Sequence, residues 1–296
     1  MTSHSKNQIS HFVRQACRLE VLASKPGNVS PDHSFSNTHC GDFLKSAEAI
    51  SPILADVSCQ QIGQRILNAV AATQQVVGHN TNLGIILLLA PLCAVQDWSN
   101  AKTEIHDLLS QASVSDAVRL YEAIRMTSAG GLGRVAEQDV AGRPTVALLE
   151  CMQLAADRDS IAEQYCTDYA FVFDTGVSLL LETASWTSHH QDRLGWVAVQ
   201  ILAAQQDSLI VRKCGSQIAD TAQKLAQKTL SAGWPFESQG QIAYNALHTY
   251  LIDDGHQRNP GTTADLIAAI LFCALRSEII SCDLSESSMQ FTKCKP

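Results

Sequence analysis

Residues 83–95, with the sequence LGIILLLAPLCAV, form the most hydrophobic stretch of the chain. The stretch spans thirteen residues and contains a proline, whereas a helix needs about 20 apolar residues to cross a bilayer. A helix that is apolar on every side is buried inside a protein. We therefore expect this stretch to form a buried core helix, and we expect a soluble protein with no membrane partner.

Outward from this stretch, apolar residues recur with the period of a helix, and the alternation typical of strands is hard to find. Residues 9–24 place Phe12, Ala16 and Leu19 on one stripe, and Pro26 ends the helix because the residue before a proline avoids helical geometry. The same periodicity predicts helices over residues 42–55, 61–77, 82–95, 115–126, 145–156, 160–183, 195–206, 215–232, 239–253 and 263–280. We predict an all-α fold: one compact domain of about ten or eleven helices over residues 1–296, with a frayed tail at 285–296.

Composition and charge exclude several classes of protein. The chain has 296 residues, 46% of them hydrophobic and 17% charged, which is an ordinary globular composition with enough residues to bury a core. It has 21 Lys and Arg against 29 Asp and Glu, a net charge of −8. Nucleic-acid binding depends on clustered basic residues, so we expect no nucleic-acid partner. A small nucleotide needs only a few local cations and stays compatible with this charge.

The cysteines and the N-terminus indicate the cellular compartment. The ten cysteines form no CxxC pair, whereas zinc sites usually pair ligands a few residues apart. The first residues, MTSHSKNQIS, lack the apolar core of a signal peptide. We therefore expect reduced, structural thiols in a cytoplasmic protein. The sequence leaves open whether the protein is a homo-oligomer.

Two loops beside predicted helices carry residues that suit an anion. In KPGNV, residues 25–29, Lys25 can present its ammonium to a phosphate, and Gly27 lets a ligand approach the backbone. The alternative is a plain helix stop with a solvated lysine. In GHNTNLG, residues 78–84, Asn80, Thr81 and Gly84 open the most apolar helix. Asn and Thr are natural helix caps, which is one explanation. Alternatively, the segment forms the floor of a phosphate or carbonyl site at a helix N-terminus.

Two further breaks combine acids with bases. The glycine-rich GGLGRVAEQD, residues 130–139, is neither a Walker A loop nor a dinucleotide fingerprint. Its Arg134 and Glu137 either belong to a site or pair on a helix face. In DSLIVRKCG, residues 207–215, Asp207 precedes an apolar run that Arg212 and Lys213 follow. This pattern is typical of a site that binds both a metal and a phosphate.

The last break, NPGTTADLIAA at residues 259–269, leads into an almost wholly apolar helix. Asn259, Pro260 and Gly261 shape a turn, and Asp265 follows near the helix start. A carboxylate there complements the helix dipole, which is one explanation. Because the helix is expected to be buried, the charge also favours a metal or a cation beside it.

These five motifs resemble, in order and approximate spacing, those of the triphosphoribosyl-dephospho-CoA synthase family. The resemblance runs from about Leu19 to about Leu275, nearly the whole chain. It implies an all-helical enzyme that acts in maturing the prosthetic groups of citrate lyase and malonate decarboxylase. Such an enzyme takes the 5-triphosphoribosyl group of ATP, releases adenine, and joins C1 of the ribose to the 2′-hydroxyl of dephospho-CoA.

The resemblance and the chemistry together suggest roles for the site residues. Breaking the glycosidic bond of ATP creates an oxocarbenium-like centre, and the triphosphate needs Mg²⁺ and cations. We expect Asp207 and Asp265 to bind Mg²⁺ or to stabilise this centre, and Glu137 to act as base or metal ligand. The expected ATP-binding residues, for phosphates and ribose, are Lys25, Gly27, Asn80, Thr81, Gly84, Arg134, Arg212, Lys213, Asn259 and Gly261.

The chain also departs from the better-known branch of that family. The branch reads N-T-H-K-G where this chain has Asn80-Thr81-Asn82-Leu83-Gly84, so its His and Lys are missing. Arg212 and Lys213 stand where that branch has His and Arg. Two alternatives therefore stay open: a ribosyl-phosphate transferase with another hydroxyl acceptor, linked to tetrahydromethanopterin-dependent C1 metabolism, and a non-catalytic nucleotide-binding or scaffold protein.

Overall fold

The computed structural model describes residues 4–35, 38–127, 133–186, 188–281 and 289–292. These residues contain fourteen α-helices, so the prediction of an all-α fold is confirmed and the helix count is higher than expected. The helices are α1 (Lys6–Leu22), α2 (Cys40–Leu54), α3 (Ile62–Val76), α4 (Leu83–Ala94), α5 (Ala101–Ser110), α6 (Val114–Met126), α7 (Leu148–Gln153), α8 (Ser160–Cys166), α9 (Val177–Glu182), α10 (Arg193–Ala204), α11 (Ser208–Cys214), α12 (Ser216–Ser231), α13 (Ser238–Ile252) and α14 (Gly261–Arg276). Short elements are η1 (Trp98–Asn100), η2 (Phe171–Gly176), η3 (His190–Asp192), β1 (Ile280–Ser281) and β2 (Gln290–Phe291).

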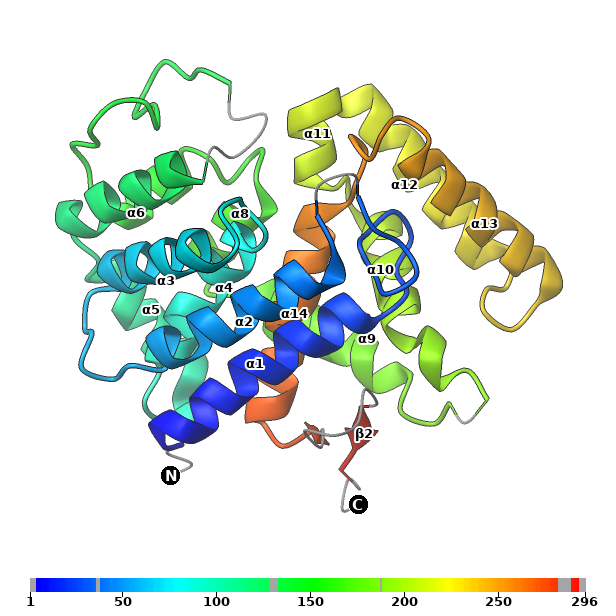
Figure 1. Cartoon of the computed structure of the whole chain (residues 1–296), viewed down its shortest axis with the longest axis horizontal. Helices are drawn as coiled ribbons and strands as arrows, with labels where there is room; N and C mark the ends of the chain where they lie inside the picture. Colours follow the sequence, from blue (N-terminus) through cyan, green and yellow to red (C-terminus); the bar gives the residue numbers. More distant parts are fainter. Residues whose placement is uncertain (1–3, 36–37, 128–132, 187, 282–288, 293–296) are drawn as a thin grey trace.

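Helix α14 is the centre of the fold. It runs between the helices α1 to α8 on one side and α9 to α13 on the other (Figure 1). It packs against α1, α4 and α10, and every residue from Leu266 to Arg276 is buried. An apolar surface on all sides of a helix is satisfied only by such enclosure. The N-terminal end of α14 lies beside the start of α11, where the Ser208 hydroxyl donates to the Thr262 hydroxyl at 2.9 Å.

Helix α4, the stretch that dominates the sequence, is the second buried helix, as predicted. All its residues from Ile85 to Ala94 are buried. Pro91 has no N–H, so it cannot bond to the carbonyl of Leu87 four residues earlier. The Tyr165 hydroxyl donates to that carbonyl instead, at 2.6 Å. Arg276 at the end of α14 donates to the carbonyls of Leu92 and Val95, at 2.7 Å each, and so closes the C-terminus of α4.

The single helix expected over residues 160–183 is divided into α8, η2 and α9. Asp168 and Tyr169, between the first two, adopt left-handed backbone angles, with φ of 50° and 61°. This break lets the buried Tyr169 hydroxyl donate to the carbonyl of Leu88, at 3.0 Å. The prediction of one continuous helix was wrong because these tertiary contacts outweigh the local periodicity.

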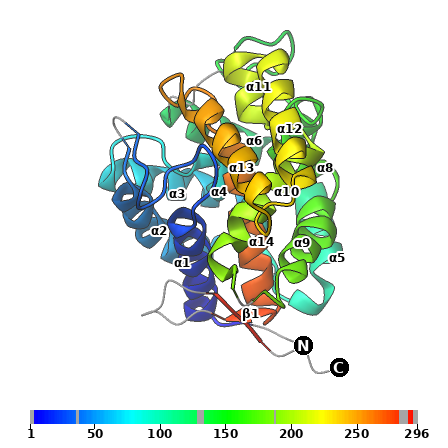
Figure 2. The same cartoon turned by 90° about the vertical axis from the view of Figure 1, so that its right-hand side faces the viewer.

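The chain beyond α14 differs from the expected frayed tail where the structure describes it. Ile280 pairs with Phe291, and Ser281 pairs with Gln290, in an antiparallel ribbon of β1 and β2. Figure 2 shows β1 beneath the C-terminal end of α14. The rest of the tail, 285–288 and 293–296, lies outside the described residues.

Two further properties of the described residues concern the cysteine thiols and the length of the apolar helices. Every cysteine in these ranges is a free thiol, and Cys17, Cys93, Cys151 and Cys273 are buried. Burial raises the pKa of the Cys93 thiol to about 12. Within the described ranges, no single helix has both the length and the apolar composition needed to cross a membrane.

Candidate functional site

Two adjoining cavities lie where α4 and α14 begin. The first cavity has a volume of about 430 Å³, and the second about 710 Å³. Both lie in the size range of small-molecule sites. The two share one wall, made by Leu87, Ile124, Asp159, Ile161 and Arg212.

The first cavity brings together most of the residues that the sequence singled out. They come from three motifs far apart in the chain, near residues 80, 212 and 260. Those that line it are Asn80, Thr81, Gly84, Arg212, Lys213, Asn259, Gly261 and Asp265. Arg134 and Glu137 line the second cavity instead. Lys25, Gly27 and Asp207 line neither.

Asp265 is one of three acidic residues that line the first cavity, together with Glu20 and Asp159. A β-carbon added at Gly84 would lie 1.9 Å from its Oδ2, so the carboxylate rests directly on the first turn of α4. Among the described residues, no group donates a hydrogen bond to this carboxyl. Desolvation by burial raises the pKa of Asp265 well above its ordinary value, and Glu20 raises it further, while Arg212 opposes the rise. A partly buried carboxyl without a donor is expected to bind a ligand cation.

The start of α4 supplies polar groups beside Asp265. The Asn80 side chain accepts a hydrogen bond from the Leu83 amide, at 3.1 Å, whereas Asn82, at the N-cap position of α4, makes no side-chain cap. The hydroxyls of Thr81 and Ser46 are 2.6 Å apart. The amides of a first helical turn have no partner within the helix, which favours an anion here. Capping and cavity lining are thus combined in one segment.

Arg212 stands on the wall between the two cavities. Its Nη1 donates to Asp159 Oδ2 at 2.9 Å, in a pair whose side chains are about one-quarter exposed. The other oxygen of Asp159 accepts from the Ile161 amide, at 2.9 Å, and so caps α8. The guanidinium is thereby held in place at the point where ligands in both cavities would come closest.

Lys213 and Asn259 close one side of the first cavity. Lys213 Nζ donates to Asn259 Oδ1 at 3.0 Å. Desolvation lowers the pKa of Lys213. Gly261 follows, and a β-carbon there would lie 2.5 Å from a methyl group of Leu209. The glycine is therefore required for packing between α14 and α11, while the lysine remains beside the cavity.

Asp207 has a structural position that differs from the expected one. Its Oδ1 accepts from the amides of Leu209 and Ile210, at 2.9 and 3.1 Å, and caps α11. Its Oδ2 accepts from the amide and the hydroxyl of Thr263, at 2.7 and 2.8 Å. Because four donors occupy this carboxylate, it joins α11 to α14 and has no oxygen aimed at a metal.

Lys25 is also engaged within the protein. Its Nζ lies 3.1 Å from Glu20 Oε1, donates to the Ala23 carbonyl at 3.1 Å, and donates to the Glu20 carbonyl. The lysine side chain is fully buried. Burial raises the pKa of Glu20, and Lys25 opposes that rise. The alternative of a solvated lysine is therefore wrong, and the ammonium contacts Glu20 rather than a cavity.

Gly27 serves packing instead of ligand approach. It has a φ of 75°, and a β-carbon there would lie 2.5 Å from Leu251 Cβ. The next residue, Asn28, does line the first cavity and donates to the Pro260 carbonyl at 3.3 Å. Residues 25–29 therefore pack against the loop that precedes α14, and Asn28 contributes one amide side chain to the first cavity.

Arg134 and Glu137 occupy an exposed loop on the second cavity. Residues 133–139 form no helix, so the alternative of an ion pair on a helix face is wrong. Asp139 organises this loop by accepting from the amides of Val135 and Ala141, each at 2.8 Å. The glycines at 130 and 131 lie outside the described residues.

Sequence reasoning missed Glu20, Asn28, Asp159 and a pair of rings. Phe35 and His256 stack with centroids 4.2 Å apart, and both line the first cavity. His256 has a φ of 66°, which is uncommon for a residue other than glycine. Asn28 lay inside a quoted motif, and its position after Gly27 was the available signal. The others lie in helices or loops without a local pattern.

The carboxylates near the first cavity are compatible with one mode of Mg²⁺ binding. Within the described ranges, no three His, Cys, Asp or Glu residues form a group that could hold a metal. Magnesium, however, commonly binds through one or two carboxylates together with substrate phosphates and water. Asp265, which has no donor, fits such a site. Asp207, whose oxygens are occupied, does not.

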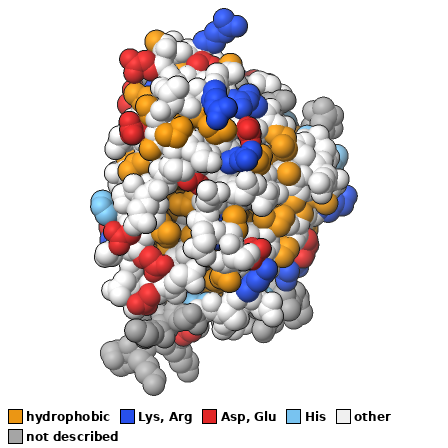
Figure 3. All heavy atoms as spheres, turned by 90° about the vertical axis from the view of Figure 1, so that its left-hand side faces the viewer, with side chains coloured by type: hydrophobic (Ala, Val, Ile, Leu, Met, Phe, Trp, Pro, Cys, Tyr) orange, Lys and Arg blue, Asp and Glu red, His pale blue; other side chains and the backbone are white. Residues whose placement is uncertain are grey.

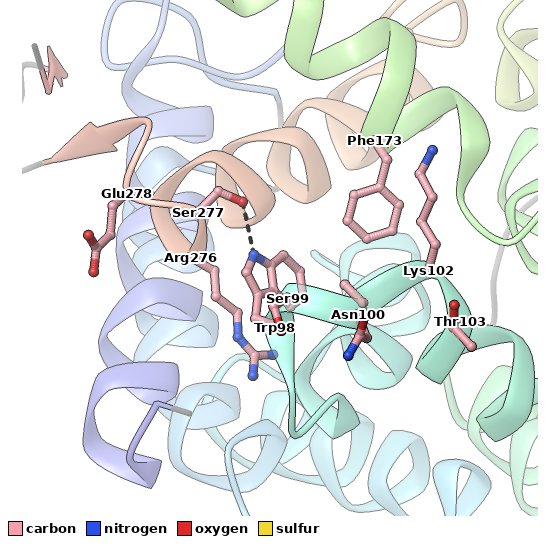
Figure 4. A pocket seen from close by; sticks show the side chains of 10 residues that line it. Trp98, Ser99, Asn100, Lys102, Thr103, Phe173, Arg276, Ser277 and Glu278 are labelled. Carbon is pink, nitrogen blue, oxygen red and sulfur yellow. Dashed lines mark hydrogen bonds between the residues drawn. The ribbon is translucent and has the colours of Figure 1, made fainter. Parts of the chain in front are cut away.

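A further cavity, of about 520 Å³, lies at the other end of α14 (Figure 4). Its walls include Trp98, Lys102, Phe173 and Arg276, and the Trp98 indole donates to Ser277 Oγ at 2.9 Å. The guanidinium of Arg276 lies 4.4 Å from the Trp98 ring. None of the site residues expected from the sequence lines this cavity, so the paired cavities at the start of α14 are the candidate site.

Comparisons with known proteins identify the family of the chain. Residues 6–282 match the model of the CitG family, described as ATP:dephospho-CoA triphosphoribosyl transferase. A crystal structure of a candidate triphosphoribosyl-dephospho-CoA synthase from Archaeoglobus fulgidus is similar, with a TM-score of 0.60 and 25% identity. The match covers 79% of this chain and 97% of that one. No curated protein sequence matches at a significant level.

Proposed function

Because the chain belongs to the ATP:dephospho-CoA triphosphoribosyl transferase family, we propose that it transfers the 5-triphosphoribosyl group of ATP to the 2′-hydroxyl of dephospho-CoA in the paired cavities. The C1–N9 bond of ATP breaks, and its electron pair leaves with adenine. The acceptor oxygen forms the new bond to C1, and its proton passes to a base. The observation that carries the proposal is Asp265, a carboxyl without a hydrogen-bond donor that faces the first turn of α4.

The first cavity suits the triphosphate and ribose of ATP. Arg212 and Lys213 supply positive charge, and the first turn of α4 supplies amides that favour an anion. Asn80 and Thr81 lie beside these groups and offer amide and hydroxyl contacts to the ribose. A Mg²⁺ ion bound with the nucleotide would neutralise phosphate charge, and Asp265 is the residue that would hold it.

Asp265 also suits the developing charge at C1. Loss of adenine creates an oxocarbenium-like centre, which a nearby carboxylate stabilises. Its raised pKa reflects a carboxyl that is costly to ionise until a cation or this positive centre arrives. Glu137 on the second cavity remains the candidate base for the acceptor hydroxyl. A single displacement converts the β-linkage of ATP into an α-linkage.

The direct test is incubation of the purified protein with Mg²⁺, ATP and dephospho-CoA, followed by chromatography for free adenine. Adenine and a dephospho-CoA adduct larger by the triphosphoribosyl group are expected. Release of ADP without adenine would show a kinase or ATPase and would overturn the proposal. Asp265→Asn is expected to lower adenine release at least a hundredfold. Asp220→Asn serves as the matched control, since Asp220 in α12 pairs with Lys224 at the surface and lines none of the cavities described above.

A different acceptor is the second candidate, and one observation favours it. Leu83 lines the first cavity where the better-known branch has a lysine, and Asn82 accepts from Thr73 at 3.0 Å instead of facing a phosphate as a cation. The same assay with an uncharged alcohol acceptor tests this candidate. Faster saturable adenine release with that alcohol than with dephospho-CoA would favour it. In either case we expect a reaction of small molecules in the cytoplasm.

A further inference from the structure

The second cavity begins where the first one ends. A transfer between two substrates requires the reacting atoms to approach to about 3–3.5 Å. Arg212, Asp159 and Ile161 form part of the wall that both cavities share. Ile161 also lies against Gly84 and the Asp265 carboxylate, because a β-carbon at Gly84 would be 2.8 Å from Ile161 Cδ1. Ligands in the two cavities would therefore meet beside Asp265.

The second cavity exposes apolar side chains that a protein normally buries. Leu154 is 39% exposed and Val135 is 37% exposed, and both line this cavity. Deeper in it, Leu120 and Met152 are buried and form an apolar floor. Exposed apolar surface gathered in a cavity indicates an apolar ligand.

Arginines surround this apolar surface. Arg125 donates through Nη1 to the carbonyls of Val140 and Gly142, at 2.7 and 3.0 Å, and pairs with no carboxylate among the described residues. Arg158 donates to the Leu154 carbonyl at 2.6 Å, and its carboxylate partner, Asp157, is largely exposed. Arg134 lines the same cavity. On the face that bears α6, basic and hydrophobic side chains lie next to one another in the upper half (Figure 3).

We propose that the second cavity binds the acceptor, and that its apolar wall and its arginines hold the phosphate-bearing arm that extends from the alcohol. This arm of the acceptor lies against Leu154 and Val135. Its phosphates lie near the arginines, which bind phosphate oxygens through paired N–H groups. The hydroxyl reaches the shared wall at Arg212. This inference rests on the proposed function, because it takes ATP to be in the first cavity.

The test changes the apolar wall without disturbing the core. Leu154→Asp and Val135→Asp alter exposed side chains, so both variants are expected to fold. Leu181→Asp is the matched control, since Leu181 in α9 is 36% exposed and lines none of the three cavities described above. Adenine release is measured with dephospho-CoA, and with AMP, which carries the same hydroxyl without the pantetheine arm. ATP affinity is measured by calorimetry.

Both wall variants are expected to raise the KM for dephospho-CoA at least tenfold, with the KM for AMP and the Kd for ATP within twofold of the wild type. If the enzyme is active and the wall variants have the same KM for dephospho-CoA as Leu181→Asp, the inference is overturned. If the wild type releases no adenine with either acceptor, the proposed function fails. A calorimetric titration with dephospho-CoA then tests, independently of activity, whether the second cavity binds this ligand. Binding that the wall variants weaken tenfold supports the cavity, and equal binding refutes it.

Discussion

Two aspartates near the starts of neighbouring helices differ in what surrounds their carboxyl groups. Asp207 receives four hydrogen bonds and joins α11 to α14. Asp265 receives none from the described residues and faces the first cavity. Burial raises the pKa of both groups, but only in Asp207 do hydrogen bonds oppose the rise. The same residue type therefore stabilises the fold at one position and is expected to bind substrate at the other.

Replacing Asp265 by Asn is expected to stabilise the free protein at neutral pH. The pKa of Asp265 in the folded state lies well above its ordinary value of 3.8. Between these two values the folded state binds more protons than the unfolded state, so stability falls as pH rises through that interval. Asparagine stays neutral and avoids this loss. Urea unfolding with EDTA should show Asp265→Asn more stable than the wild type at pH 7, with the gain reduced near pH 4. An equal difference at both pH values would contradict the assignment.

Replacing Asp207 by Ala is expected to destabilise the protein by about 3 kcal/mol or more. It removes a helix cap, worth about 1 kcal/mol, and charge-assisted bonds to Thr263, worth about 1.5–3 kcal/mol each. Denaturant unfolding gives the loss, with Asp220→Ala as the exposed control. Because Asp207 lines neither cavity of the site, ATP affinity measured on the folded fraction should stay within about twofold. A loss of ATP binding without a loss of stability would restore the expected metal-binding role.

At the scale of elements, α4 depends on side chains from distant helices. Pro91 leaves the Leu87 carbonyl without its helical donor, and Tyr165 in α8 supplies one. Arg276 in α14 closes the end of α4 with two further bonds. The most hydrophobic helix of the chain is thus completed by polar groups that its own sequence does not contain.

The variant Tyr165→Phe is expected to lower the free energy of unfolding by about 1–3 kcal/mol, because it leaves a buried carbonyl without a donor. Tyr250→Phe is the control. The Tyr250 hydroxyl donates to the Ile218 carbonyl at 3.2 Å in a partly exposed position, where water can replace it. Thermal and urea unfolding of both variants provide the measurement. Equal losses for the two tyrosines would show that the Leu87 carbonyl is satisfied in another way.

The apolar periodicity was sufficient to predict most helices, including α4 and the buried part of α14. It did not predict the break before η2, since the cause lies in Tyr169 and its distant partner Leu88. Several of the polar residues that the sequence singled out at helix starts line the first cavity, because helix starts meet there. Lys25 looked similar in sequence, but its partner Glu20 lies on the preceding helix and draws it inward.

Two of the arginines that line the second cavity were beyond the sequence argument for another reason. Arg125 lies on α6 and Arg158 lies in the loop before α8, in segments with no motif. The departures from the better-known branch at positions 82–83 and 212–213 therefore describe only part of the positive charge near the site. Arg125 and Arg158 line the second cavity and favour a phosphate-bearing acceptor.

At the scale of the whole molecule, α14 connects the two sides of the helical assembly, and the candidate site lies at its N-terminal end. A ligand that binds there contacts helices from both sides, so it should stabilise the entire fold. A ligand present at about 100 times its Kd adds about 2.7 kcal/mol. ATP with Mg²⁺ is therefore expected to raise the Tm by several degrees.

The stabilisation by ATP should depend on both the metal and Asp265. EDTA is expected to remove most of the rise in Tm, and Asp265→Asn should show little rise even with Mg²⁺. A thermal scan of both proteins with ATP, with and without EDTA, provides the measurement. An undiminished rise in EDTA would contradict a role for Mg²⁺ in nucleotide binding.

Gly84 has a consequence for the range of sequences that can encode this enzyme. Its missing side chain is the space that the Asp265 carboxylate occupies, since even a methyl group would come within 1.9 Å of Oδ2. Gly41 in α2 is the opposite case, with nothing within 4 Å of an added β-carbon. In a saturation library selected for adenine release, codons at position 84 should converge on glycine alone, while position 41 should accept alanine, serine and larger residues. Alanine at position 84 in active clones would show that the carboxylate can be displaced without cost.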